Sequence, residues 1–158
     1  MTEHRITLDV DGERYALEVE ARRLLSDVLR DLGRTCVHVG CEHGVCGACT
    51  VQVDGAPMRA CLLFAVQLEG HTIRTVADLG ANGGLDRLQQ AFHDAHGLQC
   101  GFCTPGLLMT LDALLRERAE LDEATIREVV SGHLCRCTGY DNIVKAVQLT
   151  LRRRAGAA

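Results

Sequence analysis

The sequence predicts an α+β protein with two small domains, an N-terminal unit of the β-grasp kind and a C-terminal bundle of four helices. Three observations lead to this prediction. Alternating, strand-like stretches fill residues 1–77, a polar, glycine-rich stretch occupies 78–84, and helical periodicity dominates residues 85–158. We therefore expect a first domain at 1–77, a linker at 78–84 and a second domain at 85–158.

The N-terminal domain is predicted from two hairpins, one helix and a closing strand. An Asp-Gly pair marks each hairpin, at Asp11-Gly12 and at Asp54-Gly55, which is a strong signal for a tight turn. Leucine and valine recur at helical spacing over 24–32, and Gly33 is placed to end that helix. The predicted strands are 6–10, 14–19, 51–53, 57–60 and 71–74.

The C-terminal domain is predicted to be helical because apolar residues recur every three or four positions. The helical stretches are 85–95, 105–115, 122–130 and 141–151. Pro105 suits the first turn of its helix, Asp122 starts the third helix, and Asp141 suits the N-cap of the fourth. Four short amphipathic helices imply a bundle.

Composition and charge limit the class of function. The 158 residues are 47% hydrophobic and 24% charged, which is typical of a globular protein. The formal net charge of −4, with no basic stripe, argues against binding of nucleic acid. No apolar run approaches the roughly 20 residues of a membrane span. The N-terminus enters strand-like sequence without an export signal, so we expect a cytoplasmic protein.

Nine cysteines in such a protein indicate metal ligation rather than disulfide bonds, because the cytosol keeps thiols reduced. Eight of them fall into two groups of four, one in each predicted domain. Cys36 belongs to neither group, and we interpret it as a small, buried, apolar thiol. The alternatives for Cys36 are a spare ligand or a redox-sensitive thiol.

The first group has the spacing of a plant-type ferredoxin, C-x4-C-x2-C followed by a distant fourth cysteine. Its members are Cys41, Cys46, Cys49 and Cys61. Gly40, Gly44 and Gly47 are interleaved with them, and glycine lets the backbone curl so that amide N–H groups face the sulfurs. The pattern therefore predicts a [2Fe–2S] cluster.

Two other kinds of metal site use similar residues. Structural zinc also binds four cysteines, but it usually uses paired C-x2–4-C knuckles, and only one half of this group offers one. The segment from Cys41 to His43 has the spacing of half a Rieske site, but Cys49 stands where the second histidine is needed. We therefore interpret His43 as an ordinary loop residue.

The second group comes from two distant segments, QCGFCTPG and LCRCTGY. Its members are Cys100, Cys103, Cys135 and Cys137. Thr104 can cap a helix beside Cys103, which would place the positive end of the helix dipole near an anionic cluster. If 135–137 is extended, its two thiolates point the same way and reach one iron. Zinc is again the alternative, disfavoured by the C-x-C spacing.

The motifs GCEHGVCGACT, QCGFCTPG and SGHLCRCTGY together resemble the small iron–sulfur subunit of the molybdenum hydroxylases, the family of xanthine dehydrogenase and aerobic carbon monoxide dehydrogenase. The resemblance covers nearly the whole chain. It implies a ferredoxin-like domain followed by a helical domain, each with one [2Fe–2S] cluster. In the family the helical-domain cluster lies nearer the molybdopterin. The resemblance implies that Gln99 approaches the molybdopterin and that Cys137 is the cluster ligand closest to it. His133 is a departure, since asparagine is more usual there.

The resemblance implies an electron-transfer subunit of a multi-subunit molybdenum-dependent hydroxylase or dehydrogenase. Such a subunit relays electrons from the molybdopterin centre of a large subunit, through its two clusters, to FAD in a medium subunit or to another acceptor. A hetero-oligomer, such as a dimer of heterotrimers, is expected. We identify no catalytic residues, because the chain has no dinucleotide loop, phosphate loop or ordered nucleophile–base set. The alternatives are a soluble two-cluster ferredoxin acting as a mobile carrier, and a zinc-stabilised adaptor.

Overall fold

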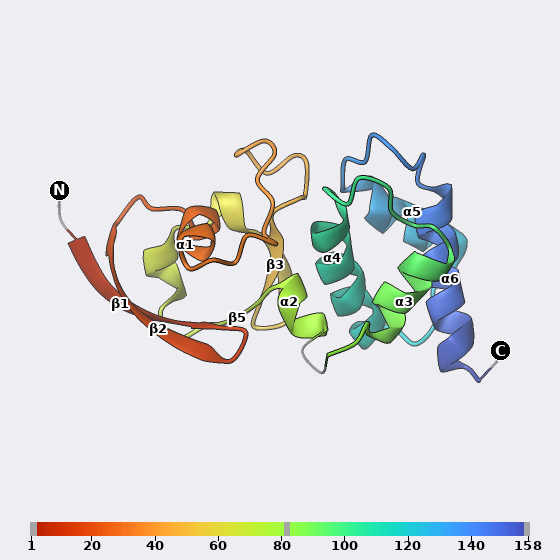
Figure 1. Cartoon of the computed structure of the whole chain (residues 1–158), viewed down its shortest axis with the longest axis horizontal. Coiled ribbons are helices and arrows are strands. Elements are labelled where there is room, and N and C mark those ends of the chain that lie inside the picture. The colour runs from red at the N-terminus through yellow and green to blue at the C-terminus, as the bar shows by residue number, and fades with distance from the viewer. Residues whose placement is uncertain (1–2, 81–82, 157–158) are drawn as a thin grey trace.

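The computed structural model describes residues 3–80 and 83–156, and Figure 1 shows a strand-rich domain beside a helical one. The strands are β1 (Glu3–Val10), β2 (Glu13–Glu20), β3 (Thr50–Val53), β4 (Ala56–Arg59) and β5 (Thr72–Arg74). The helices are α1 (Leu25–Asp31), α2 (Val76–Leu79), α3 (Arg87–Asp94), α4 (Thr104–Glu117), α5 (Glu123–Ser131) and α6 (Asp141–Arg154). Two short 3-10 turns, η1 (Ala60–Leu62) and η2 (Ala65–Leu68), lie between β4 and β5. The predicted α+β architecture is confirmed.

The five strands form one mixed sheet in the order β2-β1-β5-β3-β4. Both predicted hairpins are present, because β1 pairs antiparallel with β2 and β3 pairs antiparallel with β4. β5 lies between the hairpins, parallel to β1 and antiparallel to β3. Asp11 and Gly12 have φ angles of 53° and 80°, the left-handed backbone that a two-residue hairpin turn of this kind needs.

The core of the first domain lies between the sheet and α1. Leu8 and Ile73 on the strands, and Leu25 and Leu29 on the helix, have no exposed surface. This packing holds α1 against the sheet. Gly33, just after the helix, adopts a φ of 82°, as expected of a helix-ending glycine. The chain then enters the loop that carries the first group of cysteines.

The four predicted helices of the second domain are α3 to α6, which pack around one apolar core. Its largest buried side chains include Phe92, Leu107, Leu111, Ile126 and Ile143. α2 covers 76–79, so it overlaps the first two residues of the predicted linker. Positions 81 and 82 of that linker lie outside the described residues. Among the described helices, none has the length and apolar character that crossing a membrane requires.

Two helices begin differently from the prediction, whereas α5 begins next to Asp122, its N-cap, close to the predicted start. Asp141 is the first residue of α6 rather than its N-cap, which is Tyr140. The Tyr140 hydroxyl donates to the carbonyl of His133 at 3.0 Å, and this anchor sets the point where α6 begins. Thr104 is likewise inside α4, whose N-cap is Cys103.

β3 and α4 form much of the contact between the two domains. Gln52, fully buried on β3, donates from Nε2 to the carbonyl of Met109 at 2.9 Å and to Asp112 Oδ2 at 2.8 Å. Arg74 Nη1 donates to Gln52 Oε1 at 2.8 Å. Leaving a buried polar group unpaired costs about 1–3 kcal/mol. This network therefore favours one relative orientation of the domains.

Candidate metal centres

Three cysteines of the first group, Cys41, Cys46 and Cys49, lie in the loop between α1 and β3, and the fourth, Cys61, lies on η1. The backbone is left-handed at Glu42, Gly44 and Gly47, with φ angles of 58°, 82° and 78°. These turns bring the amide N–H of Cys46 to 3.4 Å from Cys41 Sγ. Backbone hydrogen bonds, that of Cys46 first, lower the pKa of Cys41 to about 6. The loop therefore favours a thiolate, which is the form that binds metal.

The four sulfurs of the first group approach one another as two pairs. The Cys41 thiol interacts by hydrogen bonding with that of Cys46, and the Cys61 thiol with that of Cys49, while the charge of Cys41 acts on Cys61 more weakly. Cys49 and Cys61 are the inner pair, with exposed fractions of 2% and 3%, whereas Cys41 and Cys46 are half-buried. Burial, and then the neighbouring Cys49 thiol, raises the pKa of Cys61 to about 11. Two thiolates at such a buried position need a shared cation, which iron can supply.

The second group comes together from two loops of the helical domain, one before α4 and one before α6. Cys103, the N-cap of α4, is buried, and its thiol interacts with Cys135 from the loop before α6. Burial is the main reason that the pKa of Cys103 is raised to about 12. Cys100 and Cys137 form the outer pair, since both are exposed and their sulfurs lie 3.5 Å apart.

The segment from Cys135 to Cys137 is bent in this structure, and not extended as the prediction for this motif supposes. Cys135 is paired with Cys103, and Cys137 with Cys100. The chain bends after Cys135 instead of continuing straight, and Thr138 Oγ1 lies 3.1 Å from Cys135 Sγ. This bend directs the two thiols of the C-x-C motif to different partners.

Both groups fit a cluster of two irons. Because a [2Fe–2S] cluster shares four cysteines between two irons, its ligands should approach in pairs, as these thiols do. A structural zinc ion instead needs its ligands around one point. The donor sets therefore fit two-iron clusters better than zinc.

The other residues singled out from the sequence lie near these loops. Gln99 is exposed, as is the adjacent Cys100. His43 is exposed, as expected of a loop residue. Cys36 is half-buried, and its Sγ lies 3.6 Å from Thr75 Oγ1, so its surroundings are more polar than the prediction of a buried apolar thiol.

Two contacts between the domains, made by His133 and by His38, were not predicted from the sequence. His133 is 1% exposed, and its Nε2 lies 2.8 Å from Thr110 Oγ1. Burial first, and the nearby charge of Arg59 second, lower the pKa of His133 to about 4. His38 stacks on Phe102 with ring centroids 4.9 Å apart. The cysteine loops of the two domains lie along the same side of the molecule in Figure 1. The stacking of His38 on Phe102 and the approach of His133 to Gly47 both cross from one domain to the other. Sequence patterns within one domain therefore do not indicate these contacts.

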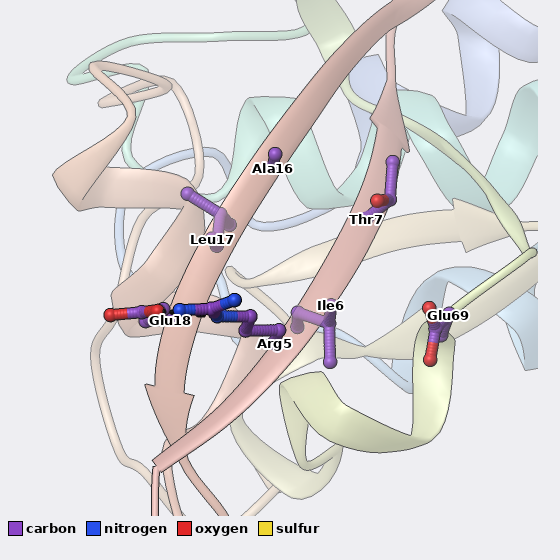
Figure 2. A pocket seen from close by; sticks show the side chains of 7 residues that line it. All are labelled: Arg5, Ile6, Thr7, Ala16, Leu17, Glu18 and Glu69. Atoms are coloured by element: carbon purple, nitrogen blue, oxygen red, sulfur yellow. Dashed lines mark hydrogen bonds and ion pairs between the residues drawn. The ribbon is translucent and has the colours of Figure 1, made fainter.

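A surface pocket lies on β1 and β2, away from the cysteine loops. Figure 2 shows its lining, in which Arg5 and Glu18 form an exposed ion pair of 2.7 Å beside small and apolar side chains and Glu69. The lining includes neither a thiol nor an imidazole. We therefore place the functional chemistry at the cysteine loops.

Comparison with known proteins matches the two domains in order. Residues 8–74 match the family described as "2Fe-2S iron-sulfur cluster binding domain", and residues 75–148 match the "[2Fe-2S] binding domain" family. The chain is 59% identical, over 94% of its length, to the "Caffeine dehydrogenase subunit gamma" of Pseudomonas sp. (strain CBB1), of which it covers 91%. The chain belongs to the small iron–sulfur subunits of the molybdenum hydroxylases.

Two further similarities agree with this assignment. The chain is 51% identical to the "6-hydroxypseudooxynicotine dehydrogenase complex subunit beta" of Paenarthrobacter nicotinovorans, with 92% of each chain covered. It matches a chain in the crystal structure of quinoline 2-oxidoreductase from Pseudomonas putida 86 with a TM-score of 0.90 and 44% identity, covering 99% of each chain. The predictions of two [2Fe–2S]-binding domains and of an electron-transfer subunit within an oxidoreductase complex are confirmed. A mobile, free carrier is not favoured.

Proposed function

We propose that each group of four cysteines holds one [2Fe–2S] cluster as two pairs of thiolates. The pairs are Cys41 with Cys46, Cys49 with Cys61, Cys100 with Cys137, and Cys103 with Cys135. The approach of the thiols in pairs is the observation that carries this proposal. Each group lies within one of the proposed domains, 1–77 and 85–158, on either side of the linker 78–84.

We propose that electrons arrive at the second group and leave from the first. A bound [2Fe–2S] cluster accepts and releases one electron. Cys100 and Cys137 are exposed at one edge of the helical domain, and Gln99 is exposed beside them. This edge can meet the molybdopterin of a partner subunit, as the family resemblance implies. The half-buried pair of Cys41 and Cys46 supports departure from the first domain.

We infer that the partners are a large molybdopterin-binding subunit and a medium FAD-binding subunit. The names of two relatives, a "subunit gamma" and a "complex subunit beta", support an assembly of several different chains. A dimer of heterotrimers located in the cytoplasm is the form that we propose.

We also propose that the assembled enzyme oxidises a nitrogen heterocycle. The supporting observation is that relatives at 59% and 51% identity and the quinoline enzyme are all named for compounds with a nitrogen-containing ring. Turnover of caffeine, nicotine and quinoline by the purified complex, compared with benzaldehyde, tests this proposal. Turnover of benzaldehyde alone would contradict it.

Capture of the tagged full-length chain from its native cells tests the assembly. We expect a molybdopterin protein to be recovered in a fixed ratio to the chain, together with substrate-dependent reduction of an acceptor dye. Recovery of the chain alone, with both clusters bound, would instead support a soluble two-cluster carrier.

Cys137→Ala tests the ligand assignment, with Cys36→Ala as its matched control because Cys36 belongs to neither group. We expect Cys137→Ala to lower the content of iron and acid-labile sulfide and to remove or alter one of two electron paramagnetic resonance signals. Cys36→Ala should keep both signals. Full iron content with two unchanged signals in Cys137→Ala would remove Cys137 from the ligand set.

A further inference from the structure

The two cysteine loops meet at a seam where backbone touches backbone. The N–H of Leu134, which precedes Cys135, donates to the carbonyl of Cys46 at 2.9 Å. One residue further along the first loop, a Cβ on Gly47 would lie only 2.4 Å from His133 Nδ1. The loop has no space there for a larger residue. The segments that carry the proposed ligands of the two clusters are therefore in direct contact.

One guanidinium group spans this seam. Arg59, at the end of β4, donates from Nη2 to the carbonyl of Gly132 at 2.8 Å and from Nε to the carbonyl of Gly44 at 3.4 Å. Its Nη1 donates to Thr50 Oγ1, and the Thr50 hydroxyl donates to the carbonyl of Gly47 at 2.6 Å. Arg59 thus binds the first cysteine loop through Nε, and through Nη1 and the Thr50 hydroxyl, while its Nη2 binds the second loop.

The charge of Arg59 is not neutralised by a carboxylate in the part of the chain that the structure describes. Arg5 and Arg127, by contrast, each form ion pairs. Arg59 is half-buried, and its hydrogen-bond partners are neutral carbonyl and hydroxyl oxygens. A cation held between two sites of net negative charge stabilises whichever of them gains a further electron.

We propose that Arg59 is a positioning residue that clamps the two cluster-binding loops together and raises the reduction potential of the first-domain cluster. The effect on that cluster is the larger because Arg59 stands two residues before Cys61 and binds the first loop through Gly44. Lysine would keep the charge, but its single ammonium cannot reproduce the planar fork that reaches both loops. The inference rests on the ligand assignment proposed above.

The test compares Arg59→Gln and Arg59→Lys in the assembled complex, with Arg5→Gln as the matched control. Arg5 is an exposed arginine on β1 that binds Glu18 and lines the pocket of Figure 2. Redox titration followed by electron paramagnetic resonance measures the potential of each cluster and the magnetic interaction between the two reduced clusters.

In Arg59→Gln we expect the ratio of oxidised to reduced first-domain cluster, at a fixed potential, to rise about tenfold. For a one-electron couple this corresponds to a reduction potential about 59 mV lower. The potential of the second cluster should fall by less. The magnetic interaction should also change, because the loops are no longer clamped. Arg59→Lys should recover most of the potential but not the wild-type magnetic interaction. Arg5→Gln should leave both readouts unchanged.

Wild-type potentials and a wild-type magnetic interaction in Arg59→Gln, at full iron and labile sulfide content, would overturn the proposal. If Arg59→Gln does not retain its clusters, the magnetic interaction measured in Arg59→Lys tests the proposal instead. A wild-type magnetic interaction in Arg59→Lys would contradict the clamp. Failure of the ligand assignment looks different, because the wild-type complex itself would then lack one or both cluster signals.

Discussion

The two groups of cysteines reach the same pairwise arrangement over very different distances in the sequence. In the first domain, three of the four thiols lie within residues 41–49, and left-handed turns at two glycines shape the loop locally. In the second, the segments 100–103 and 135–137 are separated by α4 and α5 and meet only in the folded bundle. Metal binding at the second site should therefore be coupled more strongly to folding of its domain.

The groups also differ in how much of each faces solvent. Both have a buried member, Cys61 in the first and Cys103 in the second. The outer pair of the first group is half-buried, whereas Cys100 and Cys137 are exposed. The same ligand type thus stands in two environments, and the more open one is suited to exchange charge with another subunit.

The largest predicted effect is loss of the second cluster on substitution of Cys103. Cys103→Ala should abolish the second cluster while the first keeps its signal, because Cys103 is the buried member of the proposed second ligand set. The thermal unfolding midpoint should fall by about 5–10 °C, since bound metal contributes to folding. Turnover of the assembled enzyme should stop. Cys49→Ala, the matched change in the first domain, should remove the other signal instead. Turnover at the wild-type rate in Cys103→Ala would contradict the assignment.

The next prediction concerns the point where the two loops touch. Gly47 and Gly55 both have left-handed backbone, with φ angles of 78° and 86°, but only at Gly47 would a Cβ meet another residue. Both alanine variants carry a backbone cost of about 1–2 kcal/mol. Gly47→Ala adds overpacking of about 1–3 kcal/mol against His133. We expect its thermal midpoint to lie about 3–10 °C below that of Gly55→Ala, with both cluster signals disturbed. Equal midpoints would mean that the loops are not tightly packed.

A smaller effect is expected from the polar network between β3 and α4. Gln52→Ala should lower stability by about 1–3 kcal/mol, because Met109 loses a buried hydrogen bond and Asp112 a partly buried one. Gln90→Ala, which removes an exposed hydrogen bond to Asp94, is the control and should cost much less. Thermal unfolding measures both variants. Similar losses in the two would show that the buried network does not hold the domains together.

The smallest effect on the chain itself is expected at its exposed edge. Gln99→Ala should leave the iron content, both cluster signals and the thermal midpoint unchanged, because Gln99 is exposed. It should slow electron arrival in the assembled enzyme, which rapid-mixing reduction of the clusters by substrate measures. Loss of either cluster in this variant would mean that Gln99 has a structural role.

Much of the fold could be predicted because its signals are local. The Asp-Gly pairs at 11–12 and 54–55 give both hairpins, and apolar periodicity gives all four bundle helices. The two cysteine groups were also separable from spacing alone. The exact starts of α4 and α6 were not, because neighbouring loop contacts override the capping preferences of Thr104 and Asp141.

The contacts that join the two sites could not be predicted from local patterns. The different partners of Cys135 and Cys137 depend on a bend, at which Thr138 contacts Cys135, and not on residue spacing. Arg59 and Gly132 are far apart in the sequence, as are Gly47 and His133, and each pair meets only after both domains have folded. Long-range contacts of this kind have no hydrophobic periodicity or turn motif in the sequence that would predict them.

Low-temperature electron paramagnetic resonance of the fully reduced, full-length chain tests the central claim most directly, when combined with iron and labile sulfide analysis of the same sample. We predict two distinguishable [2Fe–2S] signals of equal intensity, with iron content matching two clusters. A single signal at full iron loading, or a folded and anaerobically prepared protein without iron, would contradict the account.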